Sequence, residues 1–267
     1  MLILRHKLKL LCTSSAMSRS NDLILHRMKT IRLATIFLLA IVAIACQKQS
    51  TALTVEPSEV LLYSGGTKQL TAEPAEGVTY SSKDEFYAEV DASGLVTGNK
   101  VGETDIVASS SNGAATIPVT IMPQYSLYPE LDPIVNASKS AMIEILGSGY
   151  TESTSDKGET LYAYKNYNTY AEVIFAIFSN DVCKSIGVLV STSYLTKFTS
   201  YLKERYAVAG MQNDYYFLLN HDKDIVISLG LYNVSYLLAV YIPYTGTKSA
   251  ENDTAGILER YRNLKFL

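Results

Sequence analysis

The feature that most restricts the fold is a series of short β-forming runs between Leu53 and Ile121. Gly, Pro, Asn and Ser separate the runs, which recur roughly every ten residues, a spacing typical of an antiparallel sandwich. Residues 91–94 (DASG) and 111–113 (SNG) suit tight turns between strands, because glycine reaches a positive φ at little cost. This part of the chain therefore predicts an all-β domain.

Four segments of this region stand in an order that resembles the bacterial immunoglobulin-like group 2 family: GGTKQL at 65–70, VTYSS at 78–82, VDASGLVT at 90–97 and GETDI at 102–106. Tyr80 stands where the family usually has tryptophan, and Asp105 where small or apolar residues are commoner. The resemblance implies an immunoglobulin-like sandwich at residues 51–123 of the kind found in bacterial surface proteins, as a stalk or an adhesive module. It implies no chemistry.

After a Pro-bearing linker at 124–131, residues 132–267 predict an α+β domain. Asp132-Pro133 suits a helix start and Gly147 a helix end, and Ser193 suits the cap of a second helix at 194–206. Helix and three strands then occur twice, which predicts tandem αβββ repeats in a six-stranded antiparallel sheet with both helices on one face. The order resembles that of β-lactamase inhibitor proteins and TATA-binding-like folds. The expected strands are 160–165, 170–179, 182–190, 215–220, 224–232 and 234–242, and residues 254–267 predict a closing helix.

A leader precedes both domains. Leu33 to Ala45 are thirteen uncharged, mostly apolar residues that follow the basic segment 28–32. Because a membrane-spanning helix needs about 20 apolar residues, the segment 28–45 indicates a signal peptide. The leader is complete from Met28, so residues 1–27 indicate a start site assigned too far upstream, or a disordered extension.

Cys46 directly follows the small residue Ala45, an arrangement that resembles the lipobox of bacterial lipoproteins. Ala43 stands where leucine is commonest. The resemblance implies that Cys46 is lipidated, that residues 46–50 form a tether, and that the protein is an outer-membrane lipoprotein facing the periplasm or the cell surface. An ordinary secretory signal followed by a chance cysteine is the alternative.

Charge and histidine content limit the function. Residues 46–267 hold 16 Lys and Arg against 25 Asp and Glu, which argues against a nucleic-acid partner. His221 is the one histidine after the leader, so histidine-based catalysis and multi-histidine metal sites lack material. We therefore expect no enzyme, no cofactor and no metal. Cys183 lies in an expected strand, where it is expected to be a buried apolar residue with no disulfide.

One sheet face is the candidate ligand-binding surface. Strand alternation places Ser185, Gly187, Ser228, Gly230 and Tyr232 opposite the branched aliphatic residues of the same strands. Because those aliphatic residues suit the helix-covered side, the Ser, Gly and Tyr side is expected to be open. Seventeen of the twenty tyrosines follow Pro123, and tyrosine with small residues is a frequent recognition surface. Cross-strand aromatic packing is the alternative reading of these tyrosines.

The sequence 220–224 (NHDKD) places His221 beside two carboxylates. It joins two closely spaced strands, so we interpret it as a hairpin turn in which Asn and Asp bond to the backbone. Glu152 and Asp156 lie in an expected polar loop with equally little sign of chemistry.

These observations favour a lipid-anchored, non-enzymatic envelope protein. In this hypothesis an Ig-like spacer presents an α+β recognition domain to an envelope protein or a glycan. Two alternatives stay open: a periplasmic inhibitor or assembly factor that acts through the sheet face, and an enzyme of unknown type in the C-terminal domain.

Overall fold

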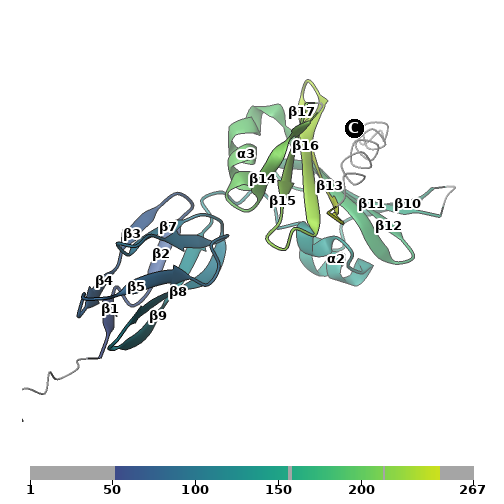
Figure 1. Cartoon of the computed structure of the whole chain (residues 1–267). Coiled ribbons are helices and arrows are strands. Elements are labelled where there is room, and N and C mark those ends of the chain that lie inside the picture. The colour runs from purple at the N-terminus through teal and green to yellow at the C-terminus, as the bar shows by residue number, and fades with distance from the viewer. Residues whose placement is uncertain (1–51, 156–157, 213, 247–267) are drawn as a thin grey trace, which may run out of the picture. The chain divides into compact units, whose positions relative to one another are not determined.

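The computed structural model describes residues 52–155, 158–212 and 214–246 (Figure 1). The expected leader, Cys46 and the expected closing helix at 254–267 lie outside the described residues. Within the described ranges, no helix has both the length and the apolar character needed to cross a membrane.

The N-terminal domain is built of strands only. Its main sheet has the order β2-β9-β8-β5, a second sheet has the order β3-β7-β6, and β1 pairs with β4. The pair β2–β9 is parallel and the others are antiparallel. The strands are β1 (Thr54–Glu56), β2 (Val60–Tyr63), β3 (Thr67–Gln69), β4 (Thr71–Glu73), β5 (Thr79–Ser82), β6 (Ala88–Val90), β7 (Leu95–Gly98), β8 (Gly102–Ser110) and β9 (Gly113–Met122).

Alternating apolar residues of these strands fill one core, which includes Ile106 and Ile117. Tyr80 packs against this core. Gly94 has φ +83°, and a Cβ there would lie 2.9 Å from the Tyr80 ring, so glycine serves both the turn and the close approach of the ring. Asp105 forms an ion pair of 2.7 Å with Lys83, which accounts for a charged side chain at that position.

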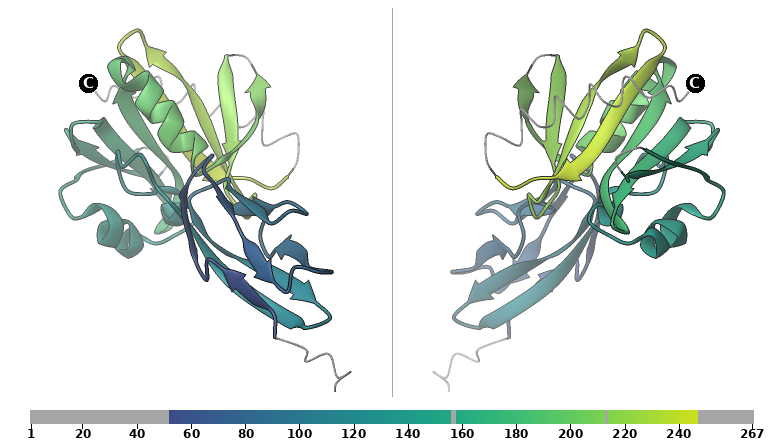
Figure 2. Two further views of the ribbon diagram at one scale, coloured as in Figure 1. Left: turned by 90° about the vertical axis from the view of Figure 1, so that its left-hand side faces the viewer. Right: turned by 90° about the vertical axis from the view of Figure 1, so that its right-hand side faces the viewer.

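The C-terminal domain contains an eight-stranded antiparallel sheet in the order β10-β11-β12-β13-β17-β16-β15-β14. Its strands can be followed in the two views of Figure 2. The strands are β10 (Thr151–Thr154), β11 (Thr160–Lys165), β12 (Ala171–Ser179), β13 (Val182–Ser191), β14 (Ala207–Gln212), β15 (Tyr215–Leu219), β16 (Ile225–Asn233) and β17 (Tyr236–Pro243).

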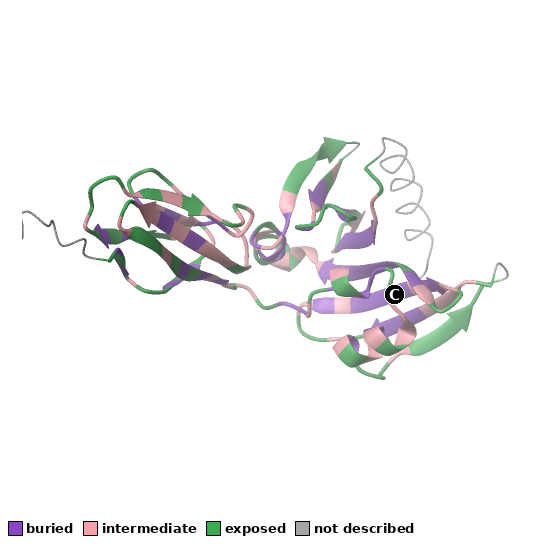
Figure 3. Ribbon diagram, turned by 60° about the horizontal axis from the view of Figure 1, so that its bottom comes forward, coloured by how far each residue is buried: buried purple, intermediate pink, exposed green. Residues whose placement is uncertain are grey.

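The prediction of six strands was therefore wrong by two. The missing strands, β10 and β14, form the two edges of the sheet. All residues of β10 are exposed, and so are all residues of β14 after Ala207. Neither strand carries the alternation that marks a half-buried strand. Figure 3 shows the contrast between buried central strands and exposed edges. Each half of the domain thus has four strands, not three.

The expected single helix at 132–146 is divided. A 3₁₀ turn, η1 (Asp132–Ile134), is followed by helix α2 (Lys139–Leu146). Asn136 between them has φ +64°, a conformation that cannot continue a helix. Ser138 caps α2 by accepting a hydrogen bond from the N–H of Ala141. The end at Gly147 is confirmed, since its N–H donates to the carbonyl of Ile143 over 2.8 Å.

The second expected helix is shorter than predicted. A 3₁₀ turn, η2 (Thr192–Tyr194), precedes helix α3 (Leu195–Lys203). The Ser191 hydroxyl accepts a hydrogen bond from the N–H of Ser193 at the start of η2, so Ser193 is not the cap, and the N-cap residue of α3, Tyr194, makes no side-chain capping bond. Helix α3 buries Phe198, Tyr201 and Leu202.

Both helices cover the same face of the sheet, as predicted. Met142 and Leu146 of α2, and Phe198 and Leu202 of α3, share one core with side chains from the sheet. The other face carries a second apolar layer, formed among the described residues by strand side chains and Tyr244. The central strands are therefore buried on both faces.

The segment expected as a linker packs into the C-terminal domain. Leu127, Tyr128 and Leu131 are buried in the helix-side core. The carboxylate of Glu204, at the end of α3, accepts hydrogen bonds of 3.1 Å from the N–H groups of residues 124 and 125. The end of α3 thus holds residues 124 and 125, and the helix-side core holds the three apolar residues that follow. The division of the chain into two independently folding parts stays a prediction.

Candidate functional site

The five residues expected on an open sheet face do share one face. They alternate with Ile186, Val188, Ile227 and Leu229, which lie in the helix-side core. The expectation that this face is open was wrong, because Ser185 is 6% exposed and Ser228 is 0% exposed.

Aromatic rings explain why this face is closed. A Cβ on Gly187 would collide with the ring of Phe175, and a Cβ on Gly230 with the ring of Tyr215. Tyr232 packs against the same apolar layer. The glycines therefore make room for rings from neighbouring strands, not for a ligand.

A hollow of about 540 Å³ lies on the opposite face, between α3 and the strands β14, β15 and β16. We call it the α3–β14 groove. Its volume is in the range of small-ligand sites, roughly 300 to 1,000 Å³. The lining residues are Leu195, Thr196, Thr199, Leu202, Lys203, Val208, Tyr216, Leu218 and Leu229.

The groove has a buried floor and exposed apolar walls. Leu202, Leu218 and Leu229 are buried, whereas Leu195, Val208 and Tyr216 are about half exposed (49%, 56% and 51%). Met211 of β14 and Leu231 of β16 are also exposed. In the part of the chain that the structure describes, eight large hydrophobic side chains are exposed, and five of them belong to this groove and its adjoining strands. Contiguous exposed apolar surface of this kind marks interaction sites.

The polar groups of the groove are few. The hydroxyl of Thr199 donates to the carbonyls of Leu195 and Thr196 within its own helix, so it is not presented to a ligand. Lys203 is the one charged residue among those that line the groove. The groove can therefore offer apolar contact and a single cation, and its lining holds no acid, histidine or cysteine.

The sequence predicts a helix at 194–206 but no strand at 207–212, so the groove could not be assembled from the sequence. The sequence carries only a weak sign of strand β14. Residues 207–212 (AVAGMQ) are a run without charge directly after an amphipathic helix.

Comparison with family models identifies the N-terminal domain. The family model described as bacterial Ig-like domain (group 2) matches residues 49–121. The N-terminal β domain is a bacterial Ig-like domain. This confirms the resemblance seen in the sequence for that part of the chain, whereas the match does not extend into the C-terminal domain.

Two solved structures resemble parts of the chain. The crystal structure of an intimin mutant of EHEC O157:H7 is 15% identical, covers 71% of this chain and 98% of its own, and has a TM-score of 0.24. Domains 5–6 of the S-layer protein SbsC are 12% identical, cover 74% and 85%, and have a TM-score of 0.23. Scores this low carry no conclusion about function. No curated protein matches the chain.

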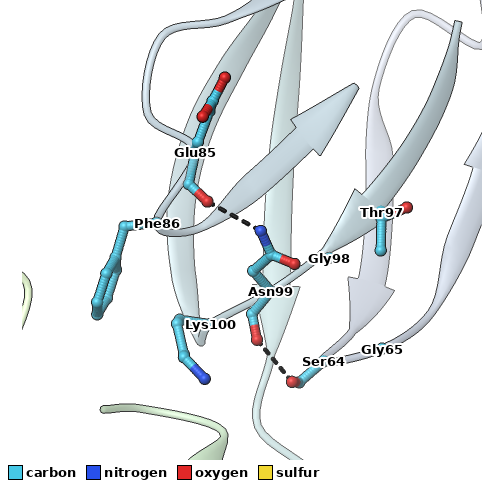
Figure 4. A pocket seen from close by; sticks show the side chains of 8 residues that line it. All are labelled: Ser64, Gly65, Glu85, Phe86, Thr97, Gly98, Asn99 and Lys100. Carbon is cyan, nitrogen blue, oxygen red and sulfur yellow. Dashed lines mark hydrogen bonds between the residues drawn. The ribbon is translucent and has the colours of Figure 1, made fainter. Parts of the chain in front are cut away.

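The Ig-like domain has a hollow of its own, of about 400 Å³, lined by residues that include Ser64, Glu85 and Asn99 (Figure 4). The Ser64 hydroxyl donates to the Asn99 carbonyl over 2.6 Å, and the Asn99 side-chain amide donates to the Glu85 carbonyl over 2.9 Å. These bonds join the loops of the domain to one another. We therefore interpret this hollow as a gap between loops.

His221, Cys183 and possible metal ligands are the remaining candidates, and the Nδ1 atom of His221 lies 2.7 Å from a carboxylate oxygen of Asp222. His221 lies in a turn between β15 and β16, as predicted, and Asn220 and Asp224 of that turn bond to each other over 2.8 Å. Cys183 is buried, and burial raises the pKa of its thiol to about 12, so it stays protonated at neutral pH. Over the part of the chain that the structure describes, no cluster of three or more His, Cys, Asp or Glu could hold a metal ion.

Proposed function

We propose that this chain is a lipid-anchored, non-enzymatic protein of the bacterial cell envelope, in which the Ig-like domain carries an α+β domain that binds another protein chain. The observation that carries the proposal is the α3–β14 groove, where apolar side chains stay exposed beside a deeply buried core. Leaving such side chains in water is unfavourable by about 25 cal/mol per Å². A bound protein would remove them from water.

The lining of the groove supports a protein ligand over a glycan or a reaction. Its walls are mainly aliphatic, with Tyr216 as the one aromatic residue among those that line it. A glycan would need many hydrogen-bond partners, which the groove does not offer. Catalysis would need a base beside a nucleophile, and Lys203 and the threonine hydroxyls do not supply that pair.

The anchor can be tested separately. Cys46→Ser is expected to leave export intact but to stop lipidation, because the acyl chains are attached through the thiol. The protein should then move from the membrane fraction to the soluble fraction, as immunoblots of fractionated cells would reveal. Mass spectrometry that finds unmodified Cys46 in membrane-fractionated native protein would contradict the anchor.

Binding through the groove can be tested by photocrosslinking in the cells that make the protein. A photoreactive amino acid such as p-benzoylphenylalanine replaces Val208 of β14 in one variant and Ser153 of β10 in the control. Both positions are exposed and lie in edge strands of the same sheet. A discrete adduct at position 208 that is weak or absent at 153 is expected. Equal labelling at the two positions, or no adduct at either, would contradict the proposal.

A further inference from the structure

We propose that the protein chain bound at the α3–β14 groove is a second copy of this chain, which pairs its β14 antiparallel to β14 of the first copy about a two-fold axis. The inference rests on the proposed function, in that it names the occupant of the same groove. Four features carry it: the bare edge of β14, the direction of its side chains, its pattern of charge, and the contrast with the other edge of the sheet.

The edge of β14 is open to pairing. Among the described residues, strand β14 ends the sheet and has β15 as its one strand partner. An edge strand leaves alternate N–H and C=O groups without strand partners, and soluble proteins usually protect such edges with charged residues or proline. Residues 207–212 contain neither. Within residues 207–212, the one protective feature is a bulge between Val208 and Gly210, which alters the twist but adds no charge.

That bulge turns two large side chains to the same side. Val208 is opposite Leu218, and Met211 is opposite Tyr216. Leu218 and Tyr216 are two residues apart and both line the groove, so Val208 and Met211 both lie on the groove side of the sheet. Without the bulge, residues three apart in a strand would point to opposite faces.

The strand is therefore complementary to itself. In an antiparallel pair centred between residues 209 and 210, Val208 lies opposite Met211 of the second copy, and the reverse pair forms by symmetry. Directly opposite side chains of an antiparallel pair contact one another. Four exposed apolar side chains, two from each copy, would thus be covered beside the two grooves.

Charge agrees with the same arrangement. Lys203 lines the groove together with Val208, near the start of β14, and Asp214 follows the end of the strand. Antiparallel pairing brings the start of one β14 to the end of the other, so Lys203 of each copy approaches Asp214 of the second copy. A parallel arrangement would instead place like charges together.

The opposite edge does not have these properties. Strand β10 has the sequence TEST and exposes only polar side chains. If β10 paired with itself antiparallel, the two Glu152 side chains would lie opposite each other when the two-fold axis passes at Glu152, and diagonal when it passes at Ser153. Both registers bring like charges together, so β10 is less suited to self-pairing than β14.

The test uses the chain from residue 47 to 267, which keeps every described residue, and measures its mass by analytical ultracentrifugation over a range of concentrations. A reversible dimer is expected. Val208→Asp should weaken dimerisation at least tenfold, because symmetry places the new charge in the interface twice. Ser153→Asp on β10 is the matched control and should leave the dissociation constant unchanged. Thermal melts of both variants establish that they are folded.

A charge exchange provides a second readout. Lys203→Glu should weaken the dimer because it faces Asp214 of the second copy, and adding Asp214→Lys should restore it. Lysine can occupy position 214, where φ is +66°, since Lys223 of this chain has φ +57°. Restoration by the second substitution would not follow from a merely structural role of Lys203.

Three results would overturn the inference: a monomer at every concentration, a dimer insensitive to Val208→Asp, or a charge exchange that fails to restore the dimer. In the photocrosslinking experiment, an adduct of twice the chain mass is expected at position 208. A specific adduct with a different protein would overturn self-association while leaving the proposed function in place. The absence of any adduct would contradict both.

Discussion

The two halves of the C-terminal domain each contain one helix and four strands, but the space beside the helix is filled in the first half and hollow in the second. In the first half, beside α2, tyrosines occupy this space, with the rings of Tyr150 and Tyr162 5.1 Å apart. Lys139 of α2 lies 4.5 Å above the Tyr162 ring and forms an ion pair with Glu152 of the edge strand. In the second half, the space beside α3 is the groove, and its edge strand carries no charge.

The comparison indicates that the first half mainly stabilises the domain, whereas the second half is free to contact other molecules. The first half closes its edge with aromatic packing and a charged pair, which both fill volume and discourage strand pairing. In the second half, the corresponding space is the α3–β14 groove, and the edge strand β14 carries no charged side chain. Because both halves share one buried sheet, the domain can keep its fold while one half stays available for binding.

The largest expected effect tests the layer that both halves share. Ser228→Glu would place a carboxylate at a position with 0% exposure, on the face we first expected to be open. We expect a loss of more than about 4 kcal/mol in the free energy of unfolding, because a buried unpaired charge is among the costliest changes. Urea unfolding followed by circular dichroism measures it.

Val234→Glu, at a residue with 92% exposure, is the matched control and should stay within about 0.5 kcal/mol. If Ser228→Glu were equally mild, the face would be open after all, and the common core of the two halves would not exist as described.

A pair of truncations compares the halves directly. Tyr162→Ala removes a side chain that is 6% exposed and should cost about 3 kcal/mol, whereas Tyr216 is 51% exposed and its replacement by alanine should cost less than about 1 kcal/mol. Chemical denaturation of the two variants gives both values. Equal losses would mean that the second half is as tightly packed as the first.

The smallest expected change in stability comes from filling the groove. Thr199→Leu adds apolar volume to a lining position and a better helix former to α3, so we expect a gain of about 1 kcal/mol in the free energy of unfolding. Thermal melts would detect this gain. A loss of that size would show that position 199 has no room for a larger side chain, and that the hollow is not available to a ligand.

Much of the fold could be predicted from sequence, because periodicity and turn chemistry are local signals. The Ig-like domain and six inner strands follow from them. The break in the helix at Asn136 could not be predicted in this way. Its φ of +64° depends on backbone hydrogen bonds that join residues 136 and 137 to Cys183, which is distant in the sequence. The two edge strands were missed because a strand exposed on both faces has no alternation to detect.

The candidate site was harder to predict for a related reason. A glycine beneath an aromatic ring and a glycine on an open surface look alike in a sequence, so Gly187 and Gly230 were assigned to an open face. The groove instead combines one helix with three strands, and its outer wall is β14, the strand whose pattern carries no signal. Only tertiary packing shows that Leu195 is left partly exposed while Leu202 is buried.

The most direct test of the contrast between the two halves is amide hydrogen exchange, resolved by residue, in the chain from 47 to 267 at low and high protein concentration. We expect the amides of β14 that point away from β15 to exchange more slowly at high concentration, because a second copy takes their hydrogen bonds. The amides of β10 should exchange at the same rate throughout. Edges that exchange alike at every concentration would contradict the account.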